Sequence, residues 1–431
     1  MKQVVLFAFL CCAVPVLSRE LNLSQAIQMA EQHSFALQKA RANSAGAVAD
    51  VSAARAERLP STSAVGSAFY VSEVPTLKIG IPPVAFTRDV GTHQTYQADF
   101  RLSVPLFTGG RISGGIDMSA ATADYYAAME SADRDRTALQ ARVEYFNLLK
   151  ADRQLQVARA SMARADVISK DVSSLYEAGA ADSVNLLEAR LATTRAGFGV
   201  KQAESNRRTV EIRISYLLGL QPSESLTAAD TLTLPDPLRL NAGVAPTKPE
   251  LMAADAGIRL GEKRLGIVRA DYFPTISAFG GYSYGKPNLD RFNNTWNGYF
   301  TFGANLNWSF NLGSKTSKKA RAAKYYIEAA QNDRSQLQEN LNRDAAVYYE
   351  QAHLAEQRAI SAADEAQIAK SNYAIAQAQH RDGVLASNRL VQIEADLTSS
   401  EAAMASSLAD YYAALSAYYY AIGSENLRKG L

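Results

Sequence analysis

Residues 55–70 read RAERLPSTSAVGSAFY, and residues 269–284 read RADYFPTISAFGGYSY. Each copy is followed by a second alternating segment, a glycine-marked turn and a very long stretch without proline. The repeated unit is roughly two hundred residues long, far beyond the period of about 20–50 residues that marks a solenoid. The sequence therefore predicts an internal duplication, in which one ancestral half-protein has been fused to itself.

The clearest local pattern is the alternation of apolar and polar residues over 96–106 and again over 300–310. Segments of about ten residues with one apolar face and aromatic ends are typical of transmembrane barrel strands. Residues 62–71 and 275–284 are the expected partner strands. A one-sided soluble sheet would show the same alternation, but a secretory signal, the aromatic ends and the duplication favour a membrane. The residues expected to face lipid are Tyr96, Phe100, Leu102, Phe300, Phe302 and Trp308.

Four strands per chain cannot close a barrel, and an open sheet edge is not tolerated in lipid. Two copies would give about eight strands, whose interior is filled by side chains. Three copies would give about twelve, an even number wide enough for a water-filled lumen. We therefore expect a mixed α and β membrane protein that forms a homotrimeric 12-stranded outer-membrane β-barrel with four strands per chain.

Proline placement predicts the helices. All 13 prolines lie at or before Pro287, and none falls between Pro105 and Pro222. Proline in a helix interior costs about 3 kcal/mol, so the two long proline-free stretches are predicted to be helical. Each is interrupted once, at residues 177–182 and 381–384, where glycine and aspartate indicate a helix stop followed by an N-cap.

Each half should therefore carry an antiparallel helical hairpin. Its first arm of about 65 residues would extend on the order of 100 Å, so the hairpin must project from any globular core. Apolar residues recur along the arm at three- and four-residue spacing, which is a coiled-coil pattern. A soluble helical bundle would show the same periodicity.

Residues 1–18 are predicted to form a secretory signal peptide, because Lys2 precedes an apolar run that ends in small residues. The run is shorter than the 20 or so residues of a transmembrane helix. Cys11 and Cys12 are the only cysteines, so the mature chain should contain no disulfide framework and no thiolate metal site. Lipidation would require one of them as the first mature residue, and the residues before them are bulkier than a lipidation site prefers.

Proline and glycine placement also predicts domain boundaries. The first structural repeat should cover residues 19–218, and the second should cover residues 249–422. The segment between them, residues 219–248, has a linker composition and is expected to be an equatorial segment. Residues 423–431 would form a C-terminal tail.

No catalytic, cofactor-binding or metal-binding site is predicted, so the protein is not expected to be an enzyme. The four histidines are scattered, and the sequence contains no P-loop, dinucleotide fingerprint or nucleophile elbow. A net charge of +2 provides no basic field for nucleic acid. The basic run over 315–324 is expected to be a solvated helical face, with contact to anionic lipid headgroups as the alternative.

Several stretches lie in the same order in both halves as in a known family. They are LNLSQAIQMAEQHSFALQKARANSAGAVADVSAARAERLPS at the start, FRLSVPLFTGGR at 100–111, LEAR at 187–190 and IEAD at 393–396. With these stretches the sequence resembles the TolC-like outer-membrane efflux protein family over essentially the whole mature chain. The resemblance implies a homotrimer in the outer membrane of a Gram-negative-type envelope, continued by a long periplasmic coiled-coil barrel.

The function implied by this resemblance is the exit duct of a tripartite efflux or type I secretion system. The duct would dock onto a periplasmic adaptor protein and, through it, serve an inner-membrane pump. No methionine-rich or histidine-rich tract argues for metal export, so organic efflux and protein secretion both stay open. The alternative class is a secreted coiled-coil adhesin, which would stay soluble without detergent, and a passive porin would lack such long hairpins.

The resemblance also implies a periplasmic gate, closed by an inward bend of the second-half hairpin and lined by acidic rings. The implied gate residues are Glu394, Glu188, Asn185 and Arg389. Val391 stands where the family has its other acidic residue. The loop from Gly383 to Ala395 is expected to be two residues longer than the loop from Gly179 to Ala189. The tips expected to meet the adaptor are Gly179, Asp182, Gly383 and Ser387.

Overall fold

The computed structural model describes residues 19–221, 225–234, 243–290, 293–310 and 312–430. The predicted signal peptide lies outside the described residues, as does part of the predicted linker. The chain divides into two compact units. One comprises Met1–Arg41, Met129–Leu251 and Gln336–Leu431, and the other comprises Ala42–Ala128 and Met252–Ser335.

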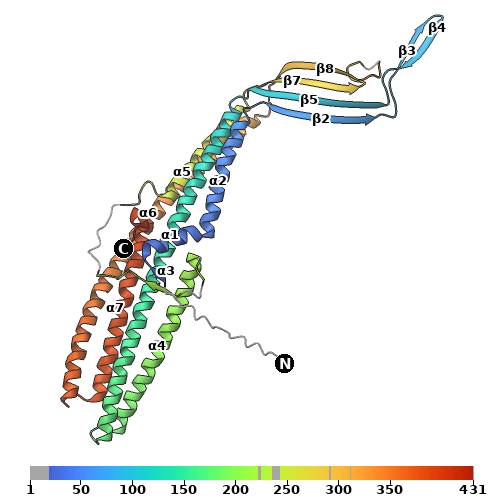
Figure 1. The fold of residues 1–431 in the computed structure, drawn as a ribbon. Coiled ribbons are helices and arrows are strands. Elements are labelled where there is room, and N and C mark those ends of the chain that lie inside the picture. Colours follow the sequence, from blue (N-terminus) through green and yellow to red (C-terminus); the bar gives the residue numbers. More distant parts are fainter. Residues whose placement is uncertain (1–18, 222–224, 235–242, 291–292, 311, 431) are drawn as a thin grey trace, which may run out of the picture. The chain divides into compact units, whose positions relative to one another are not determined.

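The second unit contains a four-stranded antiparallel sheet in the order β2-β5-β7-β8 (Figure 1). The strands are β2 (Ser61–Tyr70), β5 (Gln94–Phe107), β7 (Thr275–Lys286) and β8 (Asn297–Asn307). All four predicted strands are therefore confirmed. A further hairpin, β3 (Thr76–Ile81) and β4 (Val84–Asp89), was not predicted, because its turn consists of two prolines.

Strand register separates two faces of this sheet. Phe100 lies opposite Tyr282, and Tyr282 lies opposite Phe300, so these aromatic residues form a row across three strands. The rings of Tyr282 and Phe300 are 4.7 Å apart. The intervening residues, such as Asp99 opposite Ser283, place polar groups on the other face. The predicted alternation is thus present as one apolar and one polar face.

The prediction for Trp308 is wrong in one respect. Strand β8 ends at Asn307, so Trp308 lies beyond the strand and not within it. Its indole Nε1 donates a hydrogen bond to the carbonyl oxygen of Tyr272 at 3.2 Å. The alternation continues in the sequence, but the chain has already begun to turn toward the next helix.

Helices repeat in the same order on both sides of the duplication. Helices α2 (Phe35–Ala56) and α5 (Pro249–Ala270) precede the strands of each half. Helices α3 (Arg111–Glu177) and α6 (Lys315–Arg381) follow them and have 67 residues each. Helices α4 (Ser183–Leu218) and α7 (Ser387–Ile422) return with 36 residues each. The predicted duplication and helical hairpins are confirmed.

The two hairpin turns have the same length, since residues 178–182 join α3 to α4 and residues 382–386 join α6 to α7. The expected two-residue insertion in the second loop is therefore wrong. It came from matching Ala395 to Ala189, whereas equal turns place Ile393 at the position of Ala189. Gly179 and Gly383 both adopt left-handed backbone, with φ of 75° and 72°, as expected for helix stops.

A buried core in the first unit brings residues that follow the predicted signal peptide together with residues near the C-terminus. Helix α1 (Leu23–His33) begins in a capping box formed by Asn22 and Gln25. Strand β1 (Arg19–Leu21) pairs in parallel with β6 (Leu226–Ala228), and Leu21 and Leu226 are buried in one cluster. The predicted C-terminal tail includes a short helix, η1 (Glu425–Arg428).

Arg142 fixes that C-terminal helix to α3. The side chain is buried, and its Nη1 donates to the carbonyl oxygen of Lys429 at 2.7 Å. Its Nε donates to Ser416 Oγ at 2.8 Å. Burial lowers the pKa of Arg142 to about 10, so the guanidinium stays charged at neutral pH.

No helix in the described part of the chain is both long enough and apolar enough to cross a lipid bilayer.

Candidate functional site

The two hairpins meet near their turns in one apolar cluster. Ile168 and Val172 of α3 pack there with Leu186 and Ala189 of α4. The second hairpin contributes Ala376, Leu390 and Ile393. All of these side chains are buried, so the tips of the two hairpins share a core rather than standing apart.

Arg164 lies one helical turn before Ile168 in α3, and it connects the first hairpin to the second. Its Nε donates to Glu394 Oε1 at 3.1 Å, and its Nη2 donates to Thr398 Oγ1 and Glu401 Oε2, both at 3.0 Å. Thr398 also donates to Glu394 Oε1 at 2.7 Å. The guanidinium lies 5.9 Å from the ring centre of Tyr373 in α6. We call this group of five residues the hairpin clasp.

The clasp is largely shielded from water. The Arg164 side chain is 19% exposed and that of Glu394 is 9% exposed. Burial raises the pKa of Tyr373, an effect that the neighbouring Arg164 partly opposes. Two carboxylates share one guanidinium here, so removal of Arg164 would leave two acidic groups close together without their cation.

Glu394 thus differs from the expectation of a free carboxylate at a channel axis. Its side chain is covered and its charge is matched by Arg164 within the chain. Arg389 is exposed and donates to Gln392 of its own helix at 2.7 Å. Glu188 is exposed, and Asn185 donates its backbone N–H to Asp182. Of the four expected gate residues, the structure therefore places only Glu394 in the contact between the hairpins.

The expected adaptor-docking residues divide similarly. Gly179, Asp182 and Gly383 lie exposed at the turns. Ser387 is 7% exposed at the start of α7, so its side chain does not offer a surface to a partner. Asp182 caps α4 by accepting from the Asn185 N–H at 2.8 Å, as predicted. The N-cap of α7 is Ala386, without a side-chain cap, so the cap expected from Asp382 is not formed.

Four residues of the hairpin clasp were not predicted from the sequence: Arg164, Tyr373, Thr398 and Glu401. Part of the signal was available, because Glu394, Thr398 and Glu401 recur at spacings of four and three residues. That spacing places three polar side chains on one helix face that is otherwise apolar. Arg164 had no such signal, since its partners lie more than two hundred residues away.

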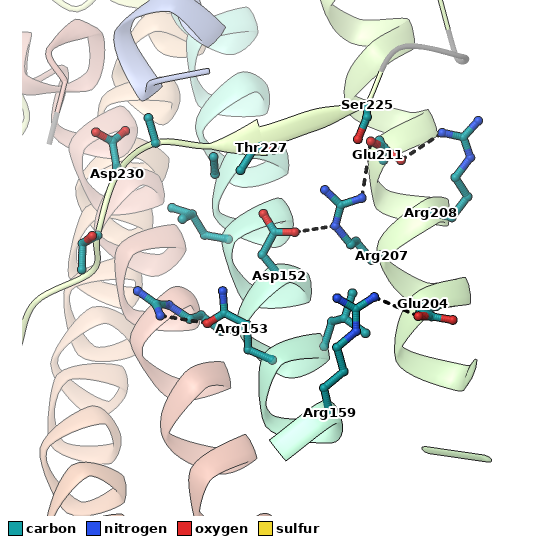
Figure 2. A pocket seen from close by; sticks show the side chains of 16 residues that line it. Asp152, Arg153, Arg159, Glu204, Arg207, Arg208, Glu211, Ser225, Thr227 and Asp230 are labelled. Carbon is teal, nitrogen blue, oxygen red and sulfur yellow. Dashed lines mark hydrogen bonds and ion pairs between the residues drawn. The ribbon is translucent and has the colours of Figure 1, made fainter. Parts of the chain in front are cut away.

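A second polar site surrounds β6 in a cavity of about 530 Å³ (Figure 2). Arg207 of α4 bridges two elements: its Nε donates to Asp152 of α3 at 2.5 Å, and its Nη2 donates to the Leu226 carbonyl at 2.6 Å. Glu211 accepts the Leu226 N–H at 2.7 Å and pairs with Arg208 at 2.9 Å. Figure 2 shows these charged groups pointing toward one another, so the site anchors β6 between α3 and α4.

The charges of this β6 anchor stabilise one another. Burial by itself would raise the pKa of Glu211, but the Leu226 N–H and the two arginines outweigh it and lower that pKa. Burial by itself would lower the pKa of Arg207, but Asp152 and Glu211 together outweigh it and raise that pKa. Both groups are therefore held in their charged forms.

Among the described residues, no group of three or more His, Cys, Asp or Glu side chains could hold a metal ion.

Comparisons with known proteins identify similar chains. The family model described as "Outer membrane efflux protein" matches residues 26–220 and 246–424. The cation efflux system protein CusC of Escherichia coli K12 is 25% identical over 223 residues, 50% of this chain and 48% of that protein. The probable outer membrane lipoprotein SilC of Salmonella typhimurium is 24% identical over 230 residues, 52% of this chain and 47% of that protein. The chain spans about half the length of these curated relatives.

Solved structures match over a larger share of the chain. The outer-membrane channel OprN has a TM-score of 0.73 at 20% identity, covering 94% of this chain and 91% of its own. CusC has a TM-score of 0.76 at 18% identity, with coverage of 94% and 92%. The open state of Neisseria gonorrhoeae MtrE has a TM-score of 0.69 at 17% identity, with coverage of 94% and 89%. At these identities the matches show a shared fold.

Proposed function

Because this chain belongs to the outer membrane efflux protein family, we propose that it forms the outer-membrane exit duct of a tripartite efflux or type I secretion system. The sheet carries the proposal. It has one apolar face and two edges that no described strand pairs with, and a 67-residue helix follows its strands in each half of the chain. Such a sheet is suited to lipid only when further strands cover its edges.

Three copies would supply those strands. Strands β2 and β8 lie at the two edges of the four-stranded sheet, so each copy offers one free edge on either side. A ring of three copies closes a barrel of about twelve strands, which leaves a water-filled interior. The polar face, with Asp99 and Arg101, would line that interior, and the row of Phe100, Tyr282 and Phe300 would face lipid.

Two neighbouring positions of β8 test this placement. Phe302 lies on the apolar face and Thr301 on the polar face. Arginine at a lipid-facing midplane position costs about 2–4 kcal/mol, whereas a lumen position accepts it. Phe302→Arg should therefore block insertion into outer-membrane vesicles, and Thr301→Arg should insert like the wild type. Equal insertion of both variants would contradict the proposal, as would full solubility of the wild type without detergent.

The hairpin turns are the proposed contact with a periplasmic adaptor, which would link the duct to an inner-membrane pump. Gly179, Asp182 and Gly383 are exposed there, and both glycines have left-handed backbone. Valine at either glycine would strain the turn by about 1–2 kcal/mol. The double variant Gly179→Val/Gly383→Val should lose export in cells while the assembled duct still inserts. Normal export by this variant would argue against the turns as the docking surface.

The hairpin clasp is the proposed latch of the periplasmic gate. Arg164 holds Glu394 and Glu401 of the second hairpin, so any motion of that hairpin away from the first must break these contacts. Glu394→Ala should increase the open probability of single ducts in planar bilayers. Glu177→Ala, at an exposed acidic residue that ends α3, is the control and should leave the open probability unchanged. An unchanged open probability for Glu394→Ala would exclude the clasp from gating.

A further inference from the structure

Both halves of the chain use the same strand register. In the first half Ser61 lies opposite Ser103, and in the second half Thr275 lies opposite Asn307. A shift of 214 residues relates β2 to β7, and a shift of 204 relates β5 to β8. At the other end of the ladder, Tyr70 lies opposite Gln94 in the first half. The same two shifts give Tyr284 and Gly298, which lie opposite each other in the second half. The shift of 204 also converts the bounds of α3 into those of α6.

The chain contains one strand pair that joins its halves, β5 with β7, in which Arg101 lies opposite Gly281 and Leu102 opposite Gly280. By the two shifts, the edge strand β8 is the equivalent of β5, and the other edge strand, β2, is the equivalent of β7. We infer that β8 of one copy pairs with β2 of the next copy in the β5–β7 register. Asn305 then lies opposite the partner's Ser67, and Leu306 lies opposite the partner's Gly66. This inference rests on the proposed trimeric duct.

The inferred register keeps the faces of the sheet continuous. Leu306 lies on the apolar face, in line with Phe302 and Phe300. Gly66 lies opposite Ala98, which is on the apolar face of β5. A slip of one residue would place the apolar residues of one copy beside the polar residues of the next, so alternation selects this register over its nearest neighbours.

Unpaired charges at the two edges fit the same arrangement. Arg111, the first residue of α3, forms an ion pair with Asp271 just after α5. The equivalents are Lys315, the first residue of α6, and Glu57, which holds the place of Asp271 in the repeated segment. Both are exposed, and no ion pair of either occurs within the described part of the chain. The inferred contact therefore pairs Lys315 with the partner's Glu57.

A glycine marks the same contact. A Cβ atom on Gly109 would lie 2.7 Å from Phe273 Cβ and 2.8 Å from the Ala270 carbonyl, so the contact between the halves requires glycine there. Gly313, the equivalent residue by the shift of 204, has no atom of the described residues within 4 Å of its Cβ position. In the inferred assembly the partner's Leu59, the equivalent of Phe273, fills this space.

Cysteine crosslinking tests the register directly. Cys11→Ala and Cys12→Ala first remove both native cysteines from the full chain. Asn305→Cys and Ser67→Cys are then introduced together, and the protein is purified in detergent and oxidised. Matched controls combine Asn305→Cys with Val65→Cys or Phe69→Cys, which lie two residues away on the same face of β2. The first pair should convert most chains into disulfide-linked dimers and trimers, and the controls should crosslink only at background level. A second test is charge reversal. Lys315→Glu should lower the temperature at which the trimer dissociates, and the double variant Lys315→Glu/Glu57→Lys should restore that temperature.

The outcomes separate this inference from the proposed function. A trimer in which a control pair crosslinks more than Asn305 with Ser67 would overturn the register while leaving the duct intact. A trimer that the double charge reversal fails to restore would overturn the ion pair. A chain that stays monomeric by mass would contradict the trimeric duct itself.

Discussion

Helices α4 and α7 are the returning arms of two hairpins that share one backbone plan. Each has 36 residues, and each ends at a glycine with φ of 71°, Gly219 or Gly423. Their side chains differ at matched positions. Asp182 caps α4, whereas Ala386 holds that place in α7 without a cap. Arg207 and Glu211 hold β6 in the first half.

At the positions of Arg207 and Glu211, α7 has Tyr411 and Leu415, which pack in an apolar cluster. The second hairpin instead presents Glu394 and Glu401 to Arg164 of the first. The duplication therefore retained main-chain geometry, which every helix and strand requires, and allowed charge to change. The first hairpin is tied to strand β6, and the second hairpin is tied to the first.

The largest expected effect is at the hairpin clasp. Arg164→Ala should lower the free energy of unfolding by about 3 kcal/mol, because it leaves the buried Glu394 and the partly exposed Glu401 close together without their shared cation. Arg389→Ala, which removes an exposed arginine with one contact inside its own helix, should cost less than about 0.5 kcal/mol. Thermal unfolding of the two variants measures the difference. Equal losses would mean that the clasp does not stabilise the contact between the hairpins.

The two terminal glycines give the next comparison. A Cβ atom on Gly219 would lie 2.4 Å from His33 Nδ1, whereas one on Gly423 would meet Ala245 Cβ at 3.5 Å. Alanine at either site costs about 1 kcal/mol for the left-handed backbone. Crowding against His33 should add about 1–3 kcal/mol for Gly219→Ala alone. Calorimetry that shows the same destabilisation at both sites would contradict the packing described around His33.

Acid should weaken the first hairpin selectively. The pKa of Glu211 is lower in the folded chain than in the unfolded chain, so its stabilisation is present above the unfolded pKa and is lost as pH falls through the folded value. Glu211→Gln should therefore be less stable than the wild type at neutral pH, by about 2 kcal/mol. The gap should shrink below about pH 4. If the difference in free energy of unfolding between the two proteins did not change with pH, the charge of Glu211 would not contribute to stability.

The smallest effect concerns the caps. Asp182→Ala should destabilise α4 by about 1 kcal/mol through loss of the N-cap. The reciprocal change, Ala386→Asp, should stabilise α7 by a similar amount, because the backbone of Ala386 is already extended as a cap requires. Hydrogen exchange at the first turn of each helix measures both changes. Slower exchange in α4 after Asp182→Ala would refute the comparison.

Periodic features of the fold were predictable from the sequence. The alternation over 96–106 located β5, and the missing prolines after Pro105 located α3 and α4. The end of β8 was predicted wrongly, because the backbone turns away from the sheet at Trp308 while the apolar–polar alternation continues in the sequence. Prediction also failed where an alignment depended on a single residue, as with Ala395. The β3–β4 hairpin was missed because its strands have six residues each and its turn, Pro82–Pro83, lacks the glycine or asparagine that usually marks a hairpin turn.

The candidate site was predictable only in part. Glu394 was identified, but its partner Arg164 was not, because the contact between α3 and α7 exists only after the two hairpins pack. Local patterns report which residues share a helix face, and they carry no information about which distant helix covers that face. The β6 anchor was missed for the same reason, since Arg207 acts on Asp152 and Leu226 through tertiary contact.

Three copies of this chain are proposed to close one membrane barrel. The most direct measurement is the native mass of the wild-type complex after extraction from the outer membrane in mild detergent. We expect a single species that contains three chains and precipitates when the detergent is removed. A monomer or dimer that is stable and stays soluble without detergent would contradict it.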